Sequence, residues 1–321
     1  MNGSFLLSIV IPVYNEEKNI SPLVARLTTV AHELHCNYEI IFVLDPCTDN
    51  TEQVIMDLRK EDTSIKLLKM SRRFGQPACT MAGIHYATGD ACVVIDADLQ
   101  DPPELIKEMV TKWKEGYHVV YAQRISRKGE TLLKRLVSYI GYWLINGIAE
   151  VKIPRNTGDF RLMSRQVVEQ LKQLKEHDSF LRGLVAYVGF NQIGIPYNRD
   201  ERFVGKGKYS RFLGSMRIGL NGVFGFSKLP LHLISILGVI IALFSFMLGL
   251  TYLILKFMNI DIPWGNPTLV ILISFLSGIQ LLSLGIMGEY FARIYDEIQK
   301  RPLFIVDIAI GFGGQDAETN E

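Results

Sequence analysis

The sequence has few cysteines and lacks the spacing by which cysteines usually form a metal site. It contains only Cys36, Cys47, Cys79 and Cys92, with no C-x-x-C pair. This pattern argues against structural zinc and fits reduced thiols facing a cytosol. Net charge is also nearly absent, because 34 Lys and Arg oppose 33 Asp and Glu in 321 residues and leave +1. The molecule therefore offers no general field for a polyanion, and nucleic acid is not an expected partner.

Two common nucleotide-binding signatures are missing. There is no G-x-x-x-x-G-K-[ST] string, and the glycine-rich run at 311–314 lies in the C-terminal tail rather than between a strand and a helix. Kinase-like and dehydrogenase functions are therefore disfavoured. Residues 1–8 lack a basic n-region and a cleavage site, so no signal peptide is predicted.

Two long segments, 231–255 and 268–288, contain no Asp, Glu, Lys or Arg. Each exceeds the ~20 apolar residues that cross a bilayer. Basic residues precede the first segment and follow the second, whereas the loop at 258–267 has none. The positive-inside rule therefore predicts a two-helix transmembrane hairpin with both large ends in the cytoplasm. We expect an integral protein of the plasma (inner) membrane. Small residues would permit close helix approach, within one chain or in a homo-oligomer, at Gly238, Gly249, Gly278, Gly285 and Gly288.

A basic and aromatic segment, 201–230, precedes the first span. Apolar residues recur there at intervals of four, at Phe212, Met216 and Leu220. This spacing predicts an amphipathic helix at the membrane interface, with cations facing the headgroups of membrane lipids. A plain linker carrying positive-inside charges is the alternative. The residues expected at the interface are Arg202, Lys206, Lys208, Tyr209 and Arg211.

The first 200 residues alternate apolar runs with helical patterns. Strands are predicted at 6–14, 38–45, 65–71, 91–98 and 118–124, and helices begin near Glu16, Asn50, Gly75, Pro102 and Glu130. Such alternation predicts a doubly wound α/β domain with a mostly parallel sheet. We expect a soluble domain at 1–200, the juxtamembrane segment at 201–230, two spans within 231–291 and a cytoplasmic tail at 292–321. The apolar part of that tail, 303–312, either adds a strand or packs on a neighbour.

Ligands of doubly wound domains bind beyond the carboxyl ends of the strands. Asp96 and Asp98 follow an apolar strand with i, i+2 spacing, so both carboxylates project to one side. They could hold a hard divalent cation on substrate phosphates, although a solvated turn with a helix cap is the alternative. Asp45 ends the second strand and either accepts hydrogen bonds from a base or ribose or fixes a loop.

Two further segments carry charged groups. Asp159 lies before a helical run at 162–174, and spacing alone favours an ordinary helix N-cap for it. Basic residues cluster after the fifth strand and form either a solvated face or a phosphate site. They are Arg124, Arg127, Lys128, Lys134 and Arg135.

Three motifs together resemble the polyprenyl-phosphate glycosyltransferases of glycosyltransferase family 2. They are SIVIPVYNEE at 8–17, DADLQDPPE at 96–104 and GDFRL at 158–162, followed by the two spans. The family includes bactoprenol glucosyltransferases and dolichol-phosphate mannose synthases. The resemblance implies a GT-A fold that moves a sugar, with UDP-glucose the favoured donor, to a polyprenyl phosphate.

The resemblance also implies roles for individual residues. The nucleoside site would contain Pro12, Tyr14, Glu16, Asp45 and Asp96. Asp98, assisted by Asp96 or Gln100, would bind Mg²⁺ or Mn²⁺. Arg124, Arg135 and Ser138 would approach the acceptor phosphate, and Asp159 would be the catalytic base. The chain departs from the pattern at 43–47, where Leu44 replaces a carboxylate of many relatives.

The reaction expected from this resemblance is an inverting transfer in which a lipid phosphate oxygen attacks the anomeric carbon. Two other functions stay open. A processive polysaccharide synthase is disfavoured because the Q-x-x-R-W string is absent. A catalytically silent protein that binds nucleotide sugar or scaffolds a translocase is the second alternative.

Overall fold

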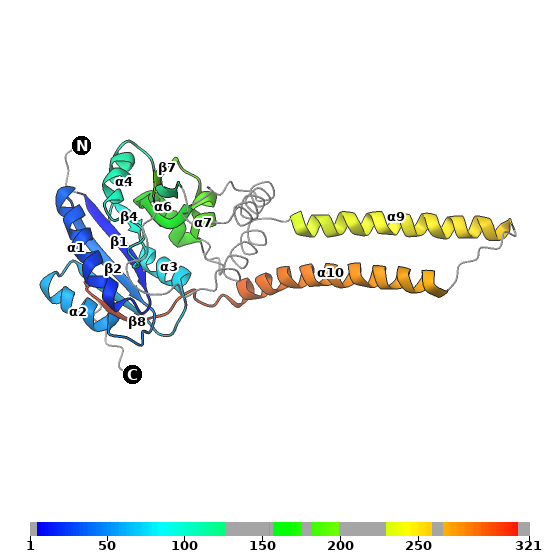
Figure 1. Cartoon of the computed structure of the whole chain (residues 1–321), viewed down its shortest axis with the longest axis horizontal. Coiled ribbons are helices and arrows are strands. Elements are labelled where there is room, and N and C mark those ends of the chain that lie inside the picture. The colour runs from blue at the N-terminus through cyan, green and yellow to red at the C-terminus, as the bar shows by residue number, and fades with distance from the viewer. Residues whose placement is uncertain are drawn as a thin grey trace. The chain divides into compact units, whose positions relative to one another are not determined.

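The structure is a computed structural model that describes residues 5–125, 154, 157–174, 181–198, 229–258 and 266–313 (Figure 1). These residues belong to two compact units. The first contains the described residues up to 198 together with 302–313, and the second contains 229–301. Each unit is described on its own below.

The first unit is built on an eight-stranded sheet with the order β7-β5-β6-β4-β1-β2-β3-β8. Parallel pairing joins β1 to β2 and β4, β2 to β3, and β5 to β7, whereas β6 and β8 run antiparallel to their neighbours. The mostly parallel sheet expected from the sequence is therefore confirmed. The strands are β1 (Leu6–Val13), β2 (Asn37–Leu44), β3 (Ile65–Met70), β4 (Ala91–Val94), β5 (Val119–Arg124), β6 (Thr157–Ser164), β7 (Gln192–Tyr197) and β8 (Val306–Ile310).

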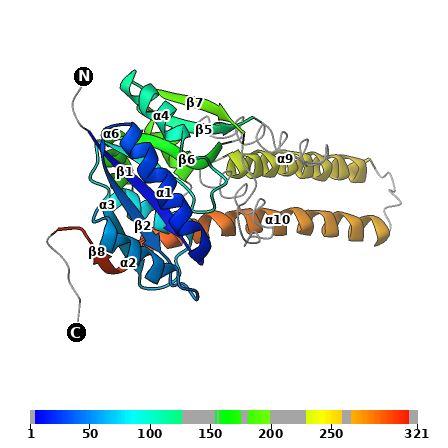
Figure 2. The ribbon, with the colours of Figure 1, turned by 60° about the vertical axis from the view of Figure 1, so that its left-hand side comes forward.

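Helices cover both faces of this sheet (Figure 2). On one face, ion pairs join α1 to α4, from Arg26 to Glu104 and from Lys107 to Glu33, and α2 packs against α1. On the other face, α3 contacts β1, β2 and α6. The helices are α1 (Glu17–Glu33), α2 (Thr51–Glu61), α3 (Gln76–Tyr86), α4 (Leu105–Lys114), α6 (Arg165–Gln173) and α7 (Leu181–Val188).

The central strands are apolar on both sides because helices bury both faces. In β1, Leu7, Ile9 and Ile11 join the core beneath α1, whereas Val10 lies against α3. A Cβ on Gly83 of α3 would come within 2.2 Å of Val10 Cγ1. Glycine at this position therefore lets the helix backbone approach the sheet closely.

The order of the strands creates a switch point between β1 and β4. The chain moves from β1 to β2 and β3 on one side, then returns to place β4 on the other side of β1. The register of β1 with β2 continues to Val13↔Leu44, whereas its register with β4 ends at Val10↔Val94. The two strands therefore diverge at their carboxyl ends, which is where open α/β sheets bind ligands.

Two sequence expectations need correction. The helical run at 162–174 is wrong, because β6 extends to Ser164 and α6 begins at Arg165. Buried Phe160 and Leu162 lie on one side of this strand, and pairing with both β4 and β5 overrides the helical spacing. The strand predicted to end at 98 ends at Val94. For the C-terminal tail, the sequence left open whether it adds a strand or packs on a neighbour. In the structure it adds a strand, β8, antiparallel to β3.

The second unit contains the helices α9 (Leu229–Phe257) and α10 (Asn266–Gln299). Both are long and apolar enough to cross a membrane, over Leu229–Leu248 and Leu272–Gln299. Most of their described apolar side chains are exposed, so these are not buried core helices of the unit. A Cβ at Gly238, Gly278, Gly285 or Gly288 would meet nothing within 4 Å. The homo-oligomer suggested by these glycines stays a prediction.

A buried ion pair stabilises the first unit at the β2–β3 pair. Glu39, 3% exposed, accepts hydrogen bonds from Lys66 Nζ (2.6 Å) and Thr88 N (2.7 Å). Burial alone would raise the pKa of Glu39, but Lys66, Ser8 and Thr88 together hold it below its usual value. The folded state therefore binds this proton less readily than the unfolded state. The resulting stability is fully present above the unfolded pKa of ~4.3 and is lost as the pH falls below it.

Lys66→Met is expected to lower the free energy of unfolding by about 2–3 kcal/mol, because it leaves a buried carboxylate without its cation. Thermal unfolding at pH 7 in detergent measures the loss, and the loss should shrink as the pH is lowered, because protonation of Glu39 removes the uncompensated buried charge. Lys60→Met removes the cation of the exposed pair with Asp57 and should change stability by no more than about 0.5 kcal/mol. Equal losses in the two variants would contradict this account of Glu39.

Candidate active site

Two loops flank the switch point. The first, after β1, carries Tyr14, Asn15 and Glu16, and the second, after β4, carries Asp96 and Asp98. Asn15 adopts φ +51°. It exchanges two hydrogen bonds with Thr48: Asn15 Nδ2 donates to Thr48 Oγ1 (3.0 Å), and Thr48 N donates to Asn15 Oδ1 (2.8 Å). These bonds fix the β1–α1 loop against the β2–α2 loop. The candidate residues of both loops are half-buried, so they are partly accessible at this edge.

The carboxylates of Asp96 and Asp98 lie directly beyond the end of β4. Gln76 Nε2 donates to Asp96 Oδ1 (2.8 Å), and the backbone N–H of Gln100 donates to Asp98 Oδ1 (3.2 Å). Within the described residues, no group of three His, Cys, Asp or Glu side chains could hold a metal by itself. Mg²⁺ and Mn²⁺ typically need only one or two carboxylates when substrate phosphates complete the shell. The donor set therefore fits an ion that arrives with a phosphorylated ligand.

Asp45 anchors the loop between β3 and α3. Its side chain is 2% exposed, and its carboxylate accepts hydrogen bonds from Phe74 N (3.0 Å) and Gly75 N (2.9 Å). Of the two roles weighed from the sequence, fixing a loop is the one the geometry displays. Contact with a nucleoside stays a prediction. Gly75 has φ +92°, a conformation that favours glycine.

Pro12 and Tyr14 border the switch point on the β1 side. Ile95 N donates to Val10 O, so the edge of β1 that Val10 and Pro12 share faces β4. The β1–β4 register has already ended at Val10, so a proline two residues later removes no ladder hydrogen bond there. Tyr14 carries the Arg73 guanidinium over its ring at 4.1 Å. Arg73 comes from the β3–α3 loop, which therefore closes one side of the site.

The opposite wall of the site begins with Asp159 on β6. Because β6 is antiparallel to β4 and Arg161 pairs with Val94, Asp159 lies two residues beyond the last pair, at the same edge as Asp96. The N-cap predicted for Asp159 is therefore wrong, because the residue lies inside a strand. Arg182 Nε on α7 donates to Asp159 Oδ1 at 3.0 Å. The Asp159 side chain is 27% exposed.

Three guanidinium groups surround Asp159. Burial by itself would raise the pKa of this carboxyl, but the charges of Arg182, Arg161 and Arg124 hold the pKa below its usual value. Arg161 is buried and donates from Nη2 to Gly158 O at 2.9 Å, and burial lowers its pKa to about 10, so it stays cationic at neutral pH. A Cβ on Gly158 would lie 2.7 Å from Arg124 Nη2. Glycine there lets Arg124 pack directly on the strand backbone.

Arg124 is held in place by a buried pair from two other elements. Arg124 Nε donates to the Tyr197 hydroxyl at 3.1 Å, and that hydroxyl donates to Asp101 Oδ1. Arg124 Nη2 lies 3.9 Å from Asp101 Oδ1. Burial and the Asp101 charge raise the pKa of Tyr197 to about 12, so the phenol keeps its proton. Among the described residues, the wall thus presents three guanidiniums and the two carboxylates of Asp101 and Asp159, a set that suits an anion.

Sequence reasoning missed several residues of this wall and of the β3–α3 loop. Arg182 and Tyr197 carried no motif signal, whereas Asp101 and Arg161 were quoted only as parts of the DADLQDPPE and GDFRL runs. Gln76 was not among the predicted site residues. Other predicted site residues lie outside the described residues: Arg135, Ser138, Arg202, Lys206, Lys208, Tyr209 and Arg211.

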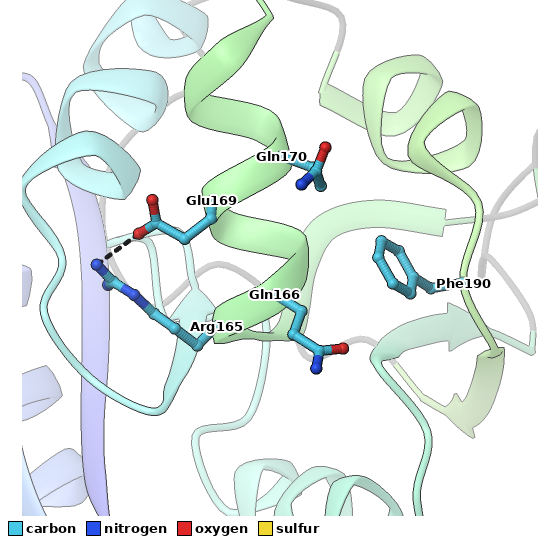
Figure 3. Close-up of a pocket in the computed structure, with 5 residues that line it drawn as sticks. All are labelled: Arg165, Gln166, Glu169, Gln170 and Phe190. Carbon is cyan, nitrogen blue, oxygen red and sulfur yellow. Dashed lines mark ion pairs between the residues drawn. The ribbon is translucent and has the colours of Figure 1, made fainter.

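An open depression elsewhere on the first unit is separate from this site. Figure 3 shows its lining, Arg165, Gln166, Glu169, Gln170 and Phe190. Arg165 and Glu169 form an ion pair at 2.5 Å. Ser164, directly before α6, pairs with Ala91, the first residue of β4. The depression therefore lies at the amino end of β4, at the opposite edge of the sheet from Asp96.

The first unit is thus a doubly wound domain with two carboxylates and a cationic wall at its switch point. Residues 8–172 match the family model described as Glycosyl transferase family 2. A protein of Synechocystis sp. named as an uncharacterized glycosyltransferase is 47% identical over 94% of both chains. The bactoprenol glucosyl transferase of Shigella phage SfII is 38% identical over 94% of this chain and 97% of its own. The chain belongs to glycosyl transferase family 2.

A solved structure agrees on the fold. The mannosyltransferase of Pyrobaculum calidifontis, determined with GDP-Man and Mn²⁺, superimposes with a TM-score of 0.50 at 18% identity. The match covers 70% of this chain and 64% of that one, slightly under two thirds of its length. At this identity the likeness concerns the fold alone. The GT-A fold and the family expected from the sequence are both confirmed.

Proposed function

We propose that this protein transfers a hexose, with UDP-glucose as the favoured donor, to a polyprenyl phosphate in a metal-dependent, inverting reaction. The observation that carries the proposal is the switch point, where Asp96 and Asp98 face the same edge of the sheet as the guanidinium wall around Asp159. Similarity to bactoprenol glucosyl transferases over 94% of the chain supports a lipid acceptor.

The donor would occupy the side formed by β1, β2 and β4. Pro12, Tyr14, Glu16 and Asp45 would border the nucleoside, with Asp96 beside them. Asp98, assisted by Asp96 or Gln100, would hold Mg²⁺ or Mn²⁺ on the diphosphate. Such an ion would neutralise the charge that develops on the leaving nucleotide.

The acceptor phosphate would bind the cationic wall through Arg124, with Arg135 and Ser138 added from the neighbouring segment. Its oxygen would form a bond to the anomeric carbon while the bond from that carbon to the diphosphate oxygen breaks, which releases UDP and inverts the configuration. A phosphate monoester has a second pKa of ~6 and is mostly dianionic at neutral pH. Asp159 therefore orients the acceptor and balances the arginines rather than removing a proton at that pH.

The two apolar helices would place the transfer reaction at a membrane. The acceptor's tail stays in the bilayer, so we place α9 and α10 across the plasma (inner) membrane and the first unit in the cytoplasm. The segment with Arg202, Lys206, Lys208, Tyr209 and Arg211 would contact the headgroups. Holding enzyme and acceptor in one plane replaces a free encounter in solution with a local one.

The test uses purified full-length protein, radiolabelled UDP-glucose, polyprenyl phosphate and Mn²⁺. The proposal predicts label in the organic phase, none when the metal is chelated and none without the lipid phosphate. A silent scaffold would bind UDP-glucose yet leave all label in water. A processive synthase would yield label in a polymer, and a parallel panel of GDP-mannose and other donors would identify a different sugar.

A further inference from the structure

The loop between β3 and α3, residues 71–75, borders the candidate donor site on two sides. Arg73 places its guanidinium 4.1 Å from the centre of the Tyr14 ring, on the β1 side. Gln76, the first residue of α3, donates from Nε2 to Asp96 Oδ1 at 2.8 Å, on the β4 side. The loop therefore bridges the two strands that diverge at the switch point. Its conformation determines where both of these side chains lie.

Three backbone N–H groups anchor this loop. Phe74 N and Gly75 N donate to the two oxygens of Asp45, which fixes the end of the loop. At its beginning, Ser71 N donates to the carbonyl oxygen of Ile305 at 3.0 Å. The first anchor is Asp45, directly after β2, but the second comes from the C-terminal segment. The Ser71 anchor is thus supplied by residues more than two hundred positions away in the chain.

The C-terminal segment, residues 303–312, is built firmly into the first unit. Its strand β8 pairs with β3 from Leu67↔Ile310 to Met70↔Val306, at the outer edge of the sheet (Figure 2). Phe304 contacts the ring of His85 at 6.0 Å, and Phe312 contacts that of Tyr86 at 5.2 Å, so both aromatic side chains dock on α3. Lys66 lies over the Phe312 ring at 5.0 Å. The segment therefore holds both β3 and α3, the two elements that the loop connects.

We propose that the C-terminal strand β8 is a positioning element of the donor site, acting through Ser71 and the β3–α3 loop on Arg73 and Gln76. The inference rests on the proposed function, since it takes Tyr14 and Asp96 as donor-binding residues. It assigns to the chain beyond α10 a role in binding the nucleotide, which is distinct from anchoring in the membrane.

The physical reason is the cost of ordering the loop. With β8 in place, the loop is fixed at both ends before the donor arrives, so little conformational entropy is lost on binding. Without the C-terminal segment, Ser71 N loses its acceptor, Ile305 O, and the edge of β3 is exposed. The loop must then be ordered at the expense of nucleotide affinity, and we expect a loss of roughly ten-fold.

The experiment compares two truncations with the full chain in detergent. One ends after Arg301 and removes β8, and the control ends after Gly313 and keeps it. Binding of UDP with Mn²⁺ is measured by calorimetry, and exchange of the Ser71, Phe74 and Gly75 amide protons by mass spectrometry. We expect about ten-fold weaker UDP binding and faster exchange at all three amides only in the shorter chain. Equal UDP affinity in the two truncations would overturn the inference.

A second experiment gives a test even if the shorter chain does not fold. A protease site inserted between Arg301 and Pro302 lets the whole chain fold before it is cut. UDP affinity should fall once the released peptide 302–321 is washed away and return when the peptide is added back. Affinity that survives complete removal of the peptide rejects the proposal.

A matched pair of variants tests the loop itself. Arg73→Ala removes the guanidinium over Tyr14 and should weaken UDP binding several-fold, whereas Arg165→Ala removes a guanidinium at the opposite edge of the sheet and should leave it within two-fold. Identical affinities would overturn the link from loop to donor. Binding of UDP needs no acceptor, so a chain that binds UDP but transfers no sugar to lipid would reject the proposed function and leave this inference standing.

Discussion

Asp98→Asn is expected to lower the initial rate of sugar transfer by on the order of 10³-fold while the protein keeps its fold. The substitution conserves volume and an oxygen but removes the negative charge that would hold a divalent ion on the donor diphosphate. Charge on the departing nucleotide would then lack its compensation, a type of loss that commonly costs 10²–10³ or more in rate. Rates measured over a series of Mn²⁺ concentrations should show that more metal restores part of the activity.

The control for this variant is Asp57→Asn. Asp57 is an exposed carboxylate of α2 that pairs with Lys60 at 2.7 Å, remote from the switch point in the sheet order. Its loss should leave transfer within two-fold of the unaltered protein. The account of the metal site would be contradicted by an Asp98→Asn protein that keeps a third or more of the activity at the usual Mn²⁺ concentration.

Asp159→Asn should lower kcat by about 10²-fold, with UDP affinity changed by less than about three-fold. In the proposed scheme the carboxylate lies on the acceptor side of the site, so the loss would concern orientation and charge balance for the incoming phosphate rather than donor binding. Because Arg182, Arg161 and Arg124 lower its pKa, Asp159 stays ionised at every pH where the enzyme is assayed. The acid limb of the rate profile should therefore follow the acceptor phosphate, near its second pKa of ~6.

The pH dependence separates two roles for Asp159. A positioning role predicts a rate loss in Asp159→Asn that is constant between pH 6 and 8. A base that removes the last acceptor proton predicts a loss that grows as the pH falls through ~6 and more acceptor is protonated. A variant that keeps full turnover at all pH values would show that the role is misassigned.

The partner of Asp159 gives a double-mutant test. Arg182→Gln alone should slow transfer by about ten-fold, and its effect in the Asp159→Asn background should be smaller, because the two side chains share one hydrogen bond. The ion pair between Arg165 and Glu169 offers a matched control at the opposite edge of the sheet. Arg165→Gln and Glu169→Gln should each leave the rate within two-fold. Strict additivity of Arg182→Gln and Asp159→Asn would contradict the coupling.

The sequence predicted the parts of the fold whose signals are local. Continuous apolar runs located β1 to β5, and the polar residues that end them placed Tyr14 and Asp96 at one edge. The failure at β6 has a physical cause: its TGDFRLMS sequence alternates, but the run beyond it has helical spacing that extends backwards across the boundary. Only pairing with β4 and β5, which the sequence alone does not reveal, assigns Asp159 to a strand.

Long-range contacts account for the remainder of the site. The sequence predicted that Asp45 lies at the end of a strand. Its two hydrogen bonds from Phe74 N and Gly75 N depend on how the β3–α3 loop folds back, which the sequence does not reveal. Arg182 reaches Asp159 from α7, and Ile305 reaches Ser71 from the other end of the chain. Neither contact follows from spacing or composition, because neither residue belongs to a motif with a fixed distance to its partner.

The central claim is that the carboxylates at the switch point bind a metal ion together with a sugar nucleotide. A crystal structure of the full chain with Mn²⁺ and UDP, with anomalous scattering recorded for manganese, tests it most directly. The account predicts one manganese peak bonded to Asp98 and to the diphosphate, with uridine beside Tyr14. Nucleotide bound at another edge of the sheet, or a manganese-free diphosphate at this one, would contradict it.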